Sequence, residues 1–219
     1  MASTAGAAPP VSVPDTMAQR LVACTVCHGK QGRATEQGYF PRIAGKPAGY
    51  LYRQLLNFRD GRRRNATMTY LVEHLDDAYL RQIAEHFASL DLPYPAPAPS
   101  AASAGMLQHG QALAQRGDAA RRLPACTQCH GLQLTGVQPA IPGLLGLPRD
   151  YLVAQFGNWR TGVRQAVAPD CMAEIAQRLS PEDIAAVSSW LAAQPVPQPA
   201  APEPPATQAL PLRCGSVAP

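Results

Sequence analysis

Two short motifs in this chain have residue types and a spacing that suit covalent attachment of a cofactor. The motifs are Cys24-Thr25-Val26-Cys27-His28 and Cys126-Thr127-Gln128-Cys129-His130. In a Cys-x-x-Cys-His motif the two thiols form thioether bonds to the vinyl groups of a c-type haem, and the histidine is the proximal iron ligand. A single Cys-x-x-Cys can instead hold zinc or act as a redox dithiol. Because both copies end in His and are followed by similar sequence, we expect two covalently bound haems c.

Each haem iron needs a second axial ligand, and methionine is the candidate in both halves. After His28 and before residue 91 the only methionine is Met68, and after His130 the only one is Met172. A methionine thioether favours ferrous iron and raises the reduction potential, as suits an electron carrier. We therefore expect His28 and Met68 on one iron and His130 and Met172 on the other.

Other residues compete with these methionines for the iron. In the first half, His74 and His86 follow the haem motif and would give a haem of lower potential with two histidine ligands. In the second half, Cys171 precedes Met172, and a thiolate ligand there would indicate sulfur chemistry. Each methionine is followed seven residues later by a leucine, and this shared spacing favours the methionines.

Residues around the haems also recur in register. Pro41 and Pro142 follow the two motifs at nearly equal distance, and the carbonyl of each is expected to accept a hydrogen bond from the proximal imidazole and so to orient it. Four aromatic residues are expected to pack on or beside the haems: Tyr50, Tyr151, Phe58 and Trp159. Trp190 is expected to close the core of the second half.

The internal repeat predicts an all-α fold. Tyr50–Gly61 recurs as Tyr151–Gly162, and each copy predicts a helix that begins near Ala48 or Arg149. A further helix is expected after Leu75 and after Leu179, the second with Ser180 as its N-cap, Pro181 at the first helical position and Asp183 in the first turn. Short amphipathic segments, 17–22 and 110–116, lead into the two motifs, and no alternating strand pattern competes.

Composition changes predict how the chain is divided. The predicted segments are a disordered N-terminal segment 1–15, a first cytochrome c domain 16–90, a Pro/Ala-rich linker 91–105, a second cytochrome c domain 106–193 and a Pro/Ala-rich tail 194–219. Disorder is the favoured interpretation of the tail, and a strap across a partner protein is the alternative. Cys171 and Cys214 are not needed for haem attachment; whether they pair is left open.

Charge and hydropathy exclude several classes of partner. The formal charge of +4 is offset by the propionates of two haems, which argues against a nucleic-acid partner. The dense basic patch at residues 62–64 is interpreted as a solvated loop, with a docking patch or a propionate contact as alternatives.

No run approaches the ~18 apolar residues of a transmembrane helix. Residues 1–10 lack the features of a signal peptide, so we infer a mature or engineered form of an exported, periplasmic protein.

These motifs together resemble the dihaem class I cytochromes c, specifically the cytochrome c4 type, over roughly residues 16–193. The resemblance implies two tandem cytochrome c folds related by a pseudo-twofold axis, each with one covalent haem and six-coordinate His/Met iron. It also implies a periplasmic electron carrier that acts between a dehydrogenase or quinol-oxidising complex and an acceptor such as a terminal oxidase, either alone or as a subunit of a larger or membrane-bound complex. The alternative is a haem enzyme, either a peroxidase or a thiosulfate-oxidising cytochrome with one catalytic haem.

Overall fold

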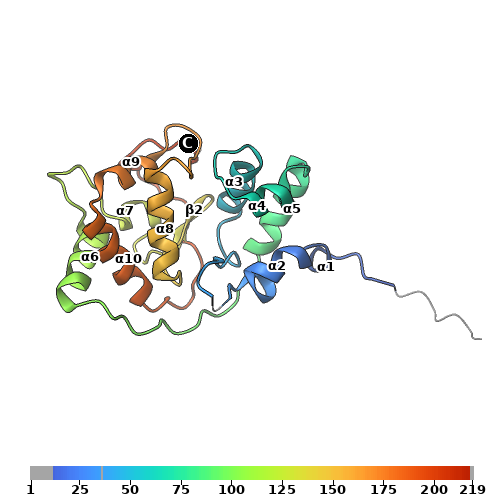
Figure 1. Cartoon of the computed structure of the whole chain (residues 1–219), viewed down its shortest axis with the longest axis horizontal. Coiled ribbons are helices and arrows are strands. Elements are labelled where there is room, and N and C mark those ends of the chain that lie inside the picture. Colours follow the sequence, from blue (N-terminus) through green and yellow to red (C-terminus); the bar gives the residue numbers. More distant parts are fainter. Residues whose placement is uncertain (1–11, 36, 218–219) are drawn as a thin grey trace, which may run out of the picture.

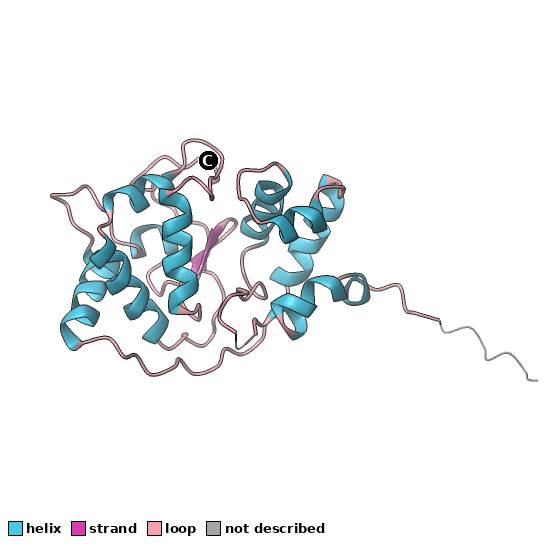
Figure 2. Cartoon of the chain, viewed as in Figure 1, coloured by secondary structure: helices cyan, strands magenta, loops and turns pink. Residues whose placement is uncertain are grey.

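The computed structural model describes residues 12–35 and 37–217, and within these ranges the chain is mostly helical (Figure 2). One group of elements comprises α1 (Met17–Arg20), α2 (Val22–His28), the 3-10 turn η1 (Lys30–Gly32), α3 (Ala48–Arg59), α4 (Ala66–Val72) and α5 (Asp77–Ala88). The other comprises α6 (Ala104–Arg116), α7 (Thr127–His130), β1 (Gly136–Val137), β2 (Ile141–Pro142), α8 (Arg149–Arg160), α9 (Cys171–Arg178) and α10 (Pro181–Ala193). Figure 1 shows the two groups as two lobes, which we call the first half and the second half.

The helices that follow the haem motifs begin and end where the repeat predicts. Both α3 and α8 begin directly after a proline, and both end just before a glycine in the left-handed region, Gly61 with φ 76° and Gly162 with φ 73°. A glycine adopts this conformation without the steric cost that other residues pay, so it ends a helix well. The matching ends give both halves a helix of the same length.

The last helix of each half also begins at the predicted place, after Leu75 and Leu179. Asp76 caps α5 by accepting a hydrogen bond from the amide of Tyr79. Ser180 and Asp183 form a reciprocal capping box at the start of α10. These caps satisfy amides that have no partner within the helix.

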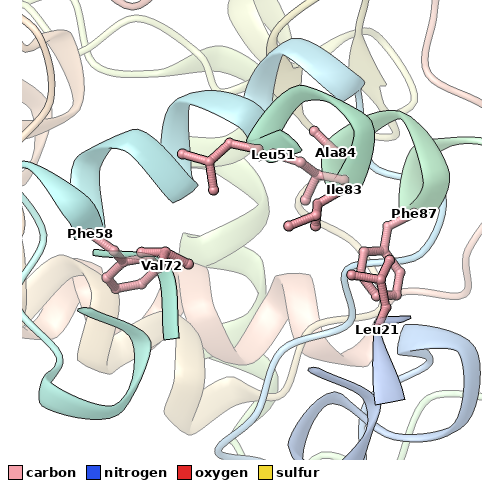
Figure 3. Packing of buried hydrophobic residues seen from close by; sticks show 8 residues of the cluster. Leu21, Leu51, Phe58, Val72, Ile83, Ala84 and Phe87 are labelled. Atoms are coloured by element: carbon pink, nitrogen blue, oxygen red, sulfur yellow. The ribbon is translucent and has the colours of Figure 1, made fainter. Parts of the chain in front are cut away.

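Each half has an apolar core between its long helices. In the first half α3 packs on α5, and Figure 3 shows Leu51, Ile83 and Ala84 close together between them. In the second half α10 packs on both α6 and α8, and Trp190 is buried there as predicted. The contact between α6 and α10 is close because Gly110 lies against the carbonyl of Ala186, where a Cβ atom would be only 2.2 Å away.

The segments that lead into the two motifs differ in length. In the first half α1 has four residues and α2 continues through the motif, whereas in the second half α6 has thirteen residues and the motif lies on the separate short α7. The antiparallel pair β1 and β2 was not predicted. With two residues in each strand, the pair is too short to leave an alternating pattern in the sequence.

The prediction of a disordered tail is wrong for the described part of that segment. Residues 194–217, which we call the C-terminal strap, contain no helix but run back along the second half, and Cys214 forms a disulfide with Cys171. Glu203 pairs with Val137 in a parallel bridge. Figure 1 shows the chain returning to the neighbourhood of α9 at its C-terminal end. Backbone pairing and a covalent link hold this Pro/Ala-rich segment in place, and neither is visible in its composition.

The described part of the N-terminal segment and the part of the linker before α6 contain no regular structure. The predicted disorder of segment 1–15 falls largely on residues 1–11, which lie outside the described residues; residues 12–15 contain no helix. The linker is irregular until α6 begins, although the buried Arg42 donates hydrogen bonds to the carbonyls of Leu92 and Pro93. Among the described helices, none combines the length and the apolar character that crossing a membrane requires.

Candidate haem sites

A cavity of about 1240 Å³ brings the predicted site residues together. Its lining includes all four motif cysteines, both motif histidines and both candidate methionines: Cys24, Cys27, Cys126, Cys129, His28, His130, Met68 and Met172. Pockets for one small molecule usually hold ~300–1,000 Å³. A cavity of this size, lined by two complete motifs from two halves, suits two large apolar groups.

Each motif histidine contacts the carbonyl of the proline that follows it in the repeat. His28 Nδ1 lies 2.8 Å from the carbonyl oxygen of Pro41, and His130 Nδ1 lies 2.7 Å from that of Pro142. A carbonyl can only accept a hydrogen bond, so the proton is on Nδ1 in both rings. This leaves Nε2 of each imidazole with a free lone pair, which is the form that binds a metal.

Burial disfavours the charged form of both imidazoles. His28 and His130 are 9% and 7% exposed. Burial lowers the pKa of each histidine, and the hydrogen bond to the proline carbonyl opposes this effect. Because the neutral imidazole is the metal-binding form, the same surroundings favour ligation of iron.

The two methionines lie at equivalent places in their halves. Met68 is in the first turn of α4 and Met172 in the first turn of α9. Asn65 and Asp170 cap these helices, so each methionine follows a fixed turn. The competing residues His74 and His86 do not line the cavity, and His74 is exposed.

Cys171, the other competing ligand, is joined to Cys214 by a disulfide. A disulfide sulfur carries no thiolate charge, and it is the thiolate that ligates iron. The pairing left open by the sequence is therefore resolved. It also removes the thiolate interpretation of the second site.

Two arginines of the cavity lining donate hydrogen bonds from one half to the other. Arg63 donates to Gln155 Oε1 at 2.9 Å and to the hydroxyl of Tyr151 at 3.2 Å. Arg164 donates to Gln54 Oε1 at 3.1 Å and to the hydroxyl of Tyr50 at 3.4 Å.

The backbone around these arginines repeats the exchange. The amide of Arg64 donates to Val163 O at 2.9 Å, and that of Gln165 donates to Arg62 O at 2.7 Å. Each contact has a counterpart with the halves interchanged. This is the arrangement that a pseudo-twofold axis produces.

The basic patch is consequently not a solvated loop throughout. Arg62 pairs with Asp60 and Arg64 is exposed, but the Arg63 guanidinium is directed into the interface and stacks 4.6 Å from the ring of Phe58. Arg164 lies 3.9 Å from the ring of Trp159 in the same way. A run of arginines in sequence does not show that its middle member meets a second segment about a hundred residues away.

Sequence reasoning missed Gln54, Gln155 and Arg164. A signal was present, because Gln54 and Gln155 are separated by the same number of residues as Tyr50 and Tyr151, and so are Arg63 and Arg164. The predicted aromatic residues all line the cavity: Tyr50, Tyr151, Phe58 and Trp159.

The polar groups of this lining fit haem propionates. Arg164 is 6% exposed, and burial lowers its pKa. Among the described residues, neither Arg63 nor Arg164 has a carboxylate within ion-pair distance. The indole Nε1 of Trp159 is buried without a hydrogen-bond partner. A buried cation and a buried N–H both require an acceptor, and a propionate carboxylate is a suitable one.

Comparisons with known proteins agree with this arrangement. The chain is 37% identical to a thiosulfate dehydrogenase electron acceptor from Thiomonas intermedia (strain K12) over 175 residues, which cover 80% of this chain and 79% of the relative. It is 34% identical to cytochrome c4 from Pseudomonas aeruginosa over 78% of this chain and 84% of the relative.

A solved structure is similar as well, although no family model matches the chain. The structure is that of a thiosulfate dehydrogenase from Marichromatium purpuratum, at 33% identity and a TM-score of 0.70. The match covers 78% of this chain but only 36% of that one. The chain therefore belongs to the cytochrome c4 family: it is an all-α, dihaem electron-transfer protein with two covalently bound haems c, and not an enzyme.

Proposed function

We propose that this cytochrome accepts electrons from a periplasmic dehydrogenase acting on a reduced sulfur compound and passes them to an acceptor such as a terminal oxidase. The observation that carries the proposal is the pair of equivalent sites, each with an oriented histidine and a methionine, in a chain whose relative is named a thiosulfate dehydrogenase electron acceptor. A haem held there supplies a one-electron ferric/ferrous couple.

The proposed iron ligands are His28 with Met68 and His130 with Met172, and the proposed thioether links are to Cys24, Cys27, Cys126 and Cys129. Protonation of both histidines at Nδ1 supports ligation through Nε2. Residence of both methionines in the cavity, each in a capped helical turn, supports them as the distal ligands. Two such ligands on each iron leave no open coordination position for a substrate, which disfavours a peroxidase.

The proposed role of Arg63 and Arg164 is to bind propionates between the halves. Both arginines line the cavity, and neither has an acidic partner among the described residues. Trp159 Nε1 would donate to the same carboxylates. The boundaries 16–90 and 106–193 of the two haem domains remain part of this proposal and are supported by the separate cores of the two halves.

The ligand assignment predicts a spectroscopic result. Replacing Met68 or Met172 by His keeps each iron six-coordinate but removes its thioether, so each single variant should lose about half of the weak near-infrared band of ferric haem with a methionine ligand. The double variant should lose the whole band. Met106→Leu, on a helix that precedes the second motif, is the matched control and should keep it. An unchanged band in Met172→His would contradict the assignment for the second iron.

The partner assignment is tested by electron transfer in solution. The oxidised cytochrome is mixed with a purified thiosulfate dehydrogenase, and thiosulfate is added while the ferrous haem absorption is recorded. Rapid reduction that requires both enzyme and thiosulfate is expected. Reduction by a quinol-oxidising complex but not by the dehydrogenase would overturn the proposed donor and leave the electron-transfer role intact.

A further inference from the structure

The C-terminal strap contributes residues to the cavity on the side of the second half. From Leu210 to Cys214 its residues alternate between the cavity and solvent, although the chain bends at Pro211 and Leu212. Leu210, Leu212 and Cys214 line the cavity, whereas Pro211 and Arg213 between them are exposed. One side of this part of the strap therefore faces the cavity, and the other side faces solvent.

Two anchors hold the strap in place. At the first anchor the amide of Gln138 donates to Glu203 O at 2.8 Å, and the amide of Glu203 donates to Gly136 O at 2.8 Å. The Glu203 carboxylate also accepts from the amide of Gln133 at 2.9 Å, and it approaches Gly131, the residue after the proximal histidine. This anchor fixes the strap to the loop that follows the haem motif.

The second anchor lies beside the proposed distal ligand. Cys214 is bonded to Cys171, whose neighbour in sequence is Met172. The amide of Gly215 donates to the carbonyl of Pro169 at 2.9 Å, and Gly215 is close enough to Ala168 that a Cβ atom would lie 2.2 Å from its carbonyl oxygen. The end of the strap is thus held against the segment that precedes Met172.

Between the anchors the strap passes the segment that carries the haem motif. Pro211 and Leu212 line a hollow of about 460 Å³ together with Pro124 and Gln128. Pro124 lies just before the motif, and Gln128 lies between its two cysteines. The strap therefore reaches from the thioether side of the second haem site to its methionine side.

The first half is open at the corresponding place. Val26 occupies the motif position that Gln128 occupies in the second half, and both are exposed. The difference is that Gln128 lines a hollow together with Pro211 and Leu212 of the strap. Tyr70 and Leu71, just after Met68, are 77% and 36% exposed. Among the described residues no segment with disulfide and backbone anchors like those of the strap lies over this part of the first half.

We propose that the C-terminal strap is a built-in cover for the second haem, closed by the Cys171–Cys214 disulfide, and that it keeps water and external redox partners from that haem. The first haem then exchanges electrons with external redox partners, and the second haem is reduced and oxidised by electron transfer from and to the first. This inference rests on the proposed position of Met172 as the distal ligand of the second iron.

A redox titration of the intact holoprotein tests the cover. Replacing both cysteines, as Cys171→Ser together with Cys214→Ser, opens the second anchor without leaving a free thiol. Access of water to a haem lowers its reduction potential, so one of the two redox waves should shift to lower potential while the other stays in place. Thr207→Ala, at an exposed strap position, is the matched control and should shift neither wave.

The shifted wave must be that of the second haem, and Met172→His identifies it because this variant changes a ligand of the second iron alone. If Met172→His moves neither wave, the ligand assignment fails. If it moves one wave and the cysteine variant moves the other or none, the ligand assignment stands and the cover is refuted.

Exposure of the haem edge is the second, independent readout. A soluble paramagnetic chelate should broaden the shifted methyl resonances of only one ferric haem in the native protein, and those of both haems in the cysteine variant or after removal of residues 204–219. Equal broadening of both haems in the native protein would overturn the proposal. Detection of two free thiols after denaturation of the holoprotein of unchanged sequence would also overturn the proposal, because the cover requires the disulfide.

Discussion

Arg164 is buried and Arg63 is half-buried, and both guanidiniums lie among hydroxyl, amide and aromatic groups. Each has two neutral acceptors from the other half and an aromatic ring from its own half beneath its guanidinium. Neutral contacts of this kind orient a guanidinium but do not neutralise it. The charge therefore acts on whatever redox group occupies the cavity, and because each side chain reaches into the other half it acts on both sites.

This placement predicts a shared effect on potential. Arg164→Gln removes a positive charge that favours the reduced form, so both haem potentials should fall by tens of millivolts, on the order of 1 kcal/mol for one electron. Arg213→Gln, which removes the same charge from an exposed position of the strap, is the control and should change little. A titration in which only one wave moves would show that Arg164 serves a single haem.

At the scale of elements, the start of α10 concentrates polar contacts in the second half. The carboxylate of Asp183 is buried and accepts from His109 Nε2 at 2.7 Å, from Arg121 Nη1 at 2.5 Å and from the amide of Ser180 at 2.9 Å. These contacts join α10 to α6 and to the loop before α7. Burial alone would raise the pKa of Asp183, but Arg121, Ser180 and His109 outweigh it and hold the pKa well below its usual range.

The direction of this pKa shift fixes a pH dependence. A carboxyl with a depressed pKa in the folded state stabilises the fold at pH values above its unfolded pKa of ~3.9, and this stabilisation is lost progressively as the pH falls below that value towards the folded-state pKa. Asp183→Asn should lower the free energy of unfolding by ~1–3 kcal/mol at pH 6, because buried partners lose a charged acceptor. The difference from the native protein should shrink by pH 3 in urea titrations.

Asp150→Asn provides the matched control for this pH series. Asp150 pairs with Arg149 on the surface, with its side chain 88% exposed, so its loss should have little effect at either pH. A penalty for Asp183→Asn that is as large at pH 3 as at pH 6 would contradict an electrostatic origin.

The sequence allowed the local elements to be predicted and not the long-range contacts. The bounds of α3, α8, α5 and α10 follow from periodicity, from caps such as Ser180 and from glycines such as Gly61, all of which act within a few residues. The direction of Arg63 and the path of the strap depend on segments far away in the chain. Cys171 and Cys214, separated by 43 residues, could be listed as possible partners, but composition does not decide a pairing.

At the scale of the whole molecule, the two halves meet through closely packed backbone as well as through arginines. Gly49, at the start of α3, donates from its amide to the carbonyl of Pro139 in the second half at 3.0 Å. A Cβ atom at Gly49 would lie 2.7 Å from that oxygen and 3.2 Å from Cβ of Ala140. Only a residue without a side chain permits this approach.

A pair of glycine variants measures how much this contact contributes. Gly49→Ala should push the halves apart and lower the free energy of unfolding of the holoprotein by ~1–3 kcal/mol, as overpacking does. Gly157→Ala, in the interior of α8 with open space around the position, should instead raise it by up to ~1 kcal/mol because alanine favours helix. Thermal unfolding of both variants gives the comparison, and equal melting temperatures would refute the packing argument.

The exchanged contacts between the halves also bear on ancestry. Arg63 donates to Gln155 as Arg164 donates to Gln54, so the surface of each half contains both a donor and an acceptor for the other half. Such a self-complementary surface is what two identical chains present to each other in a symmetric dimer. Its bonds require no covalent tether. A single-haem ancestor could have formed this contact as a homodimer before gene fusion, and the linker would then have made permanent an association that already existed.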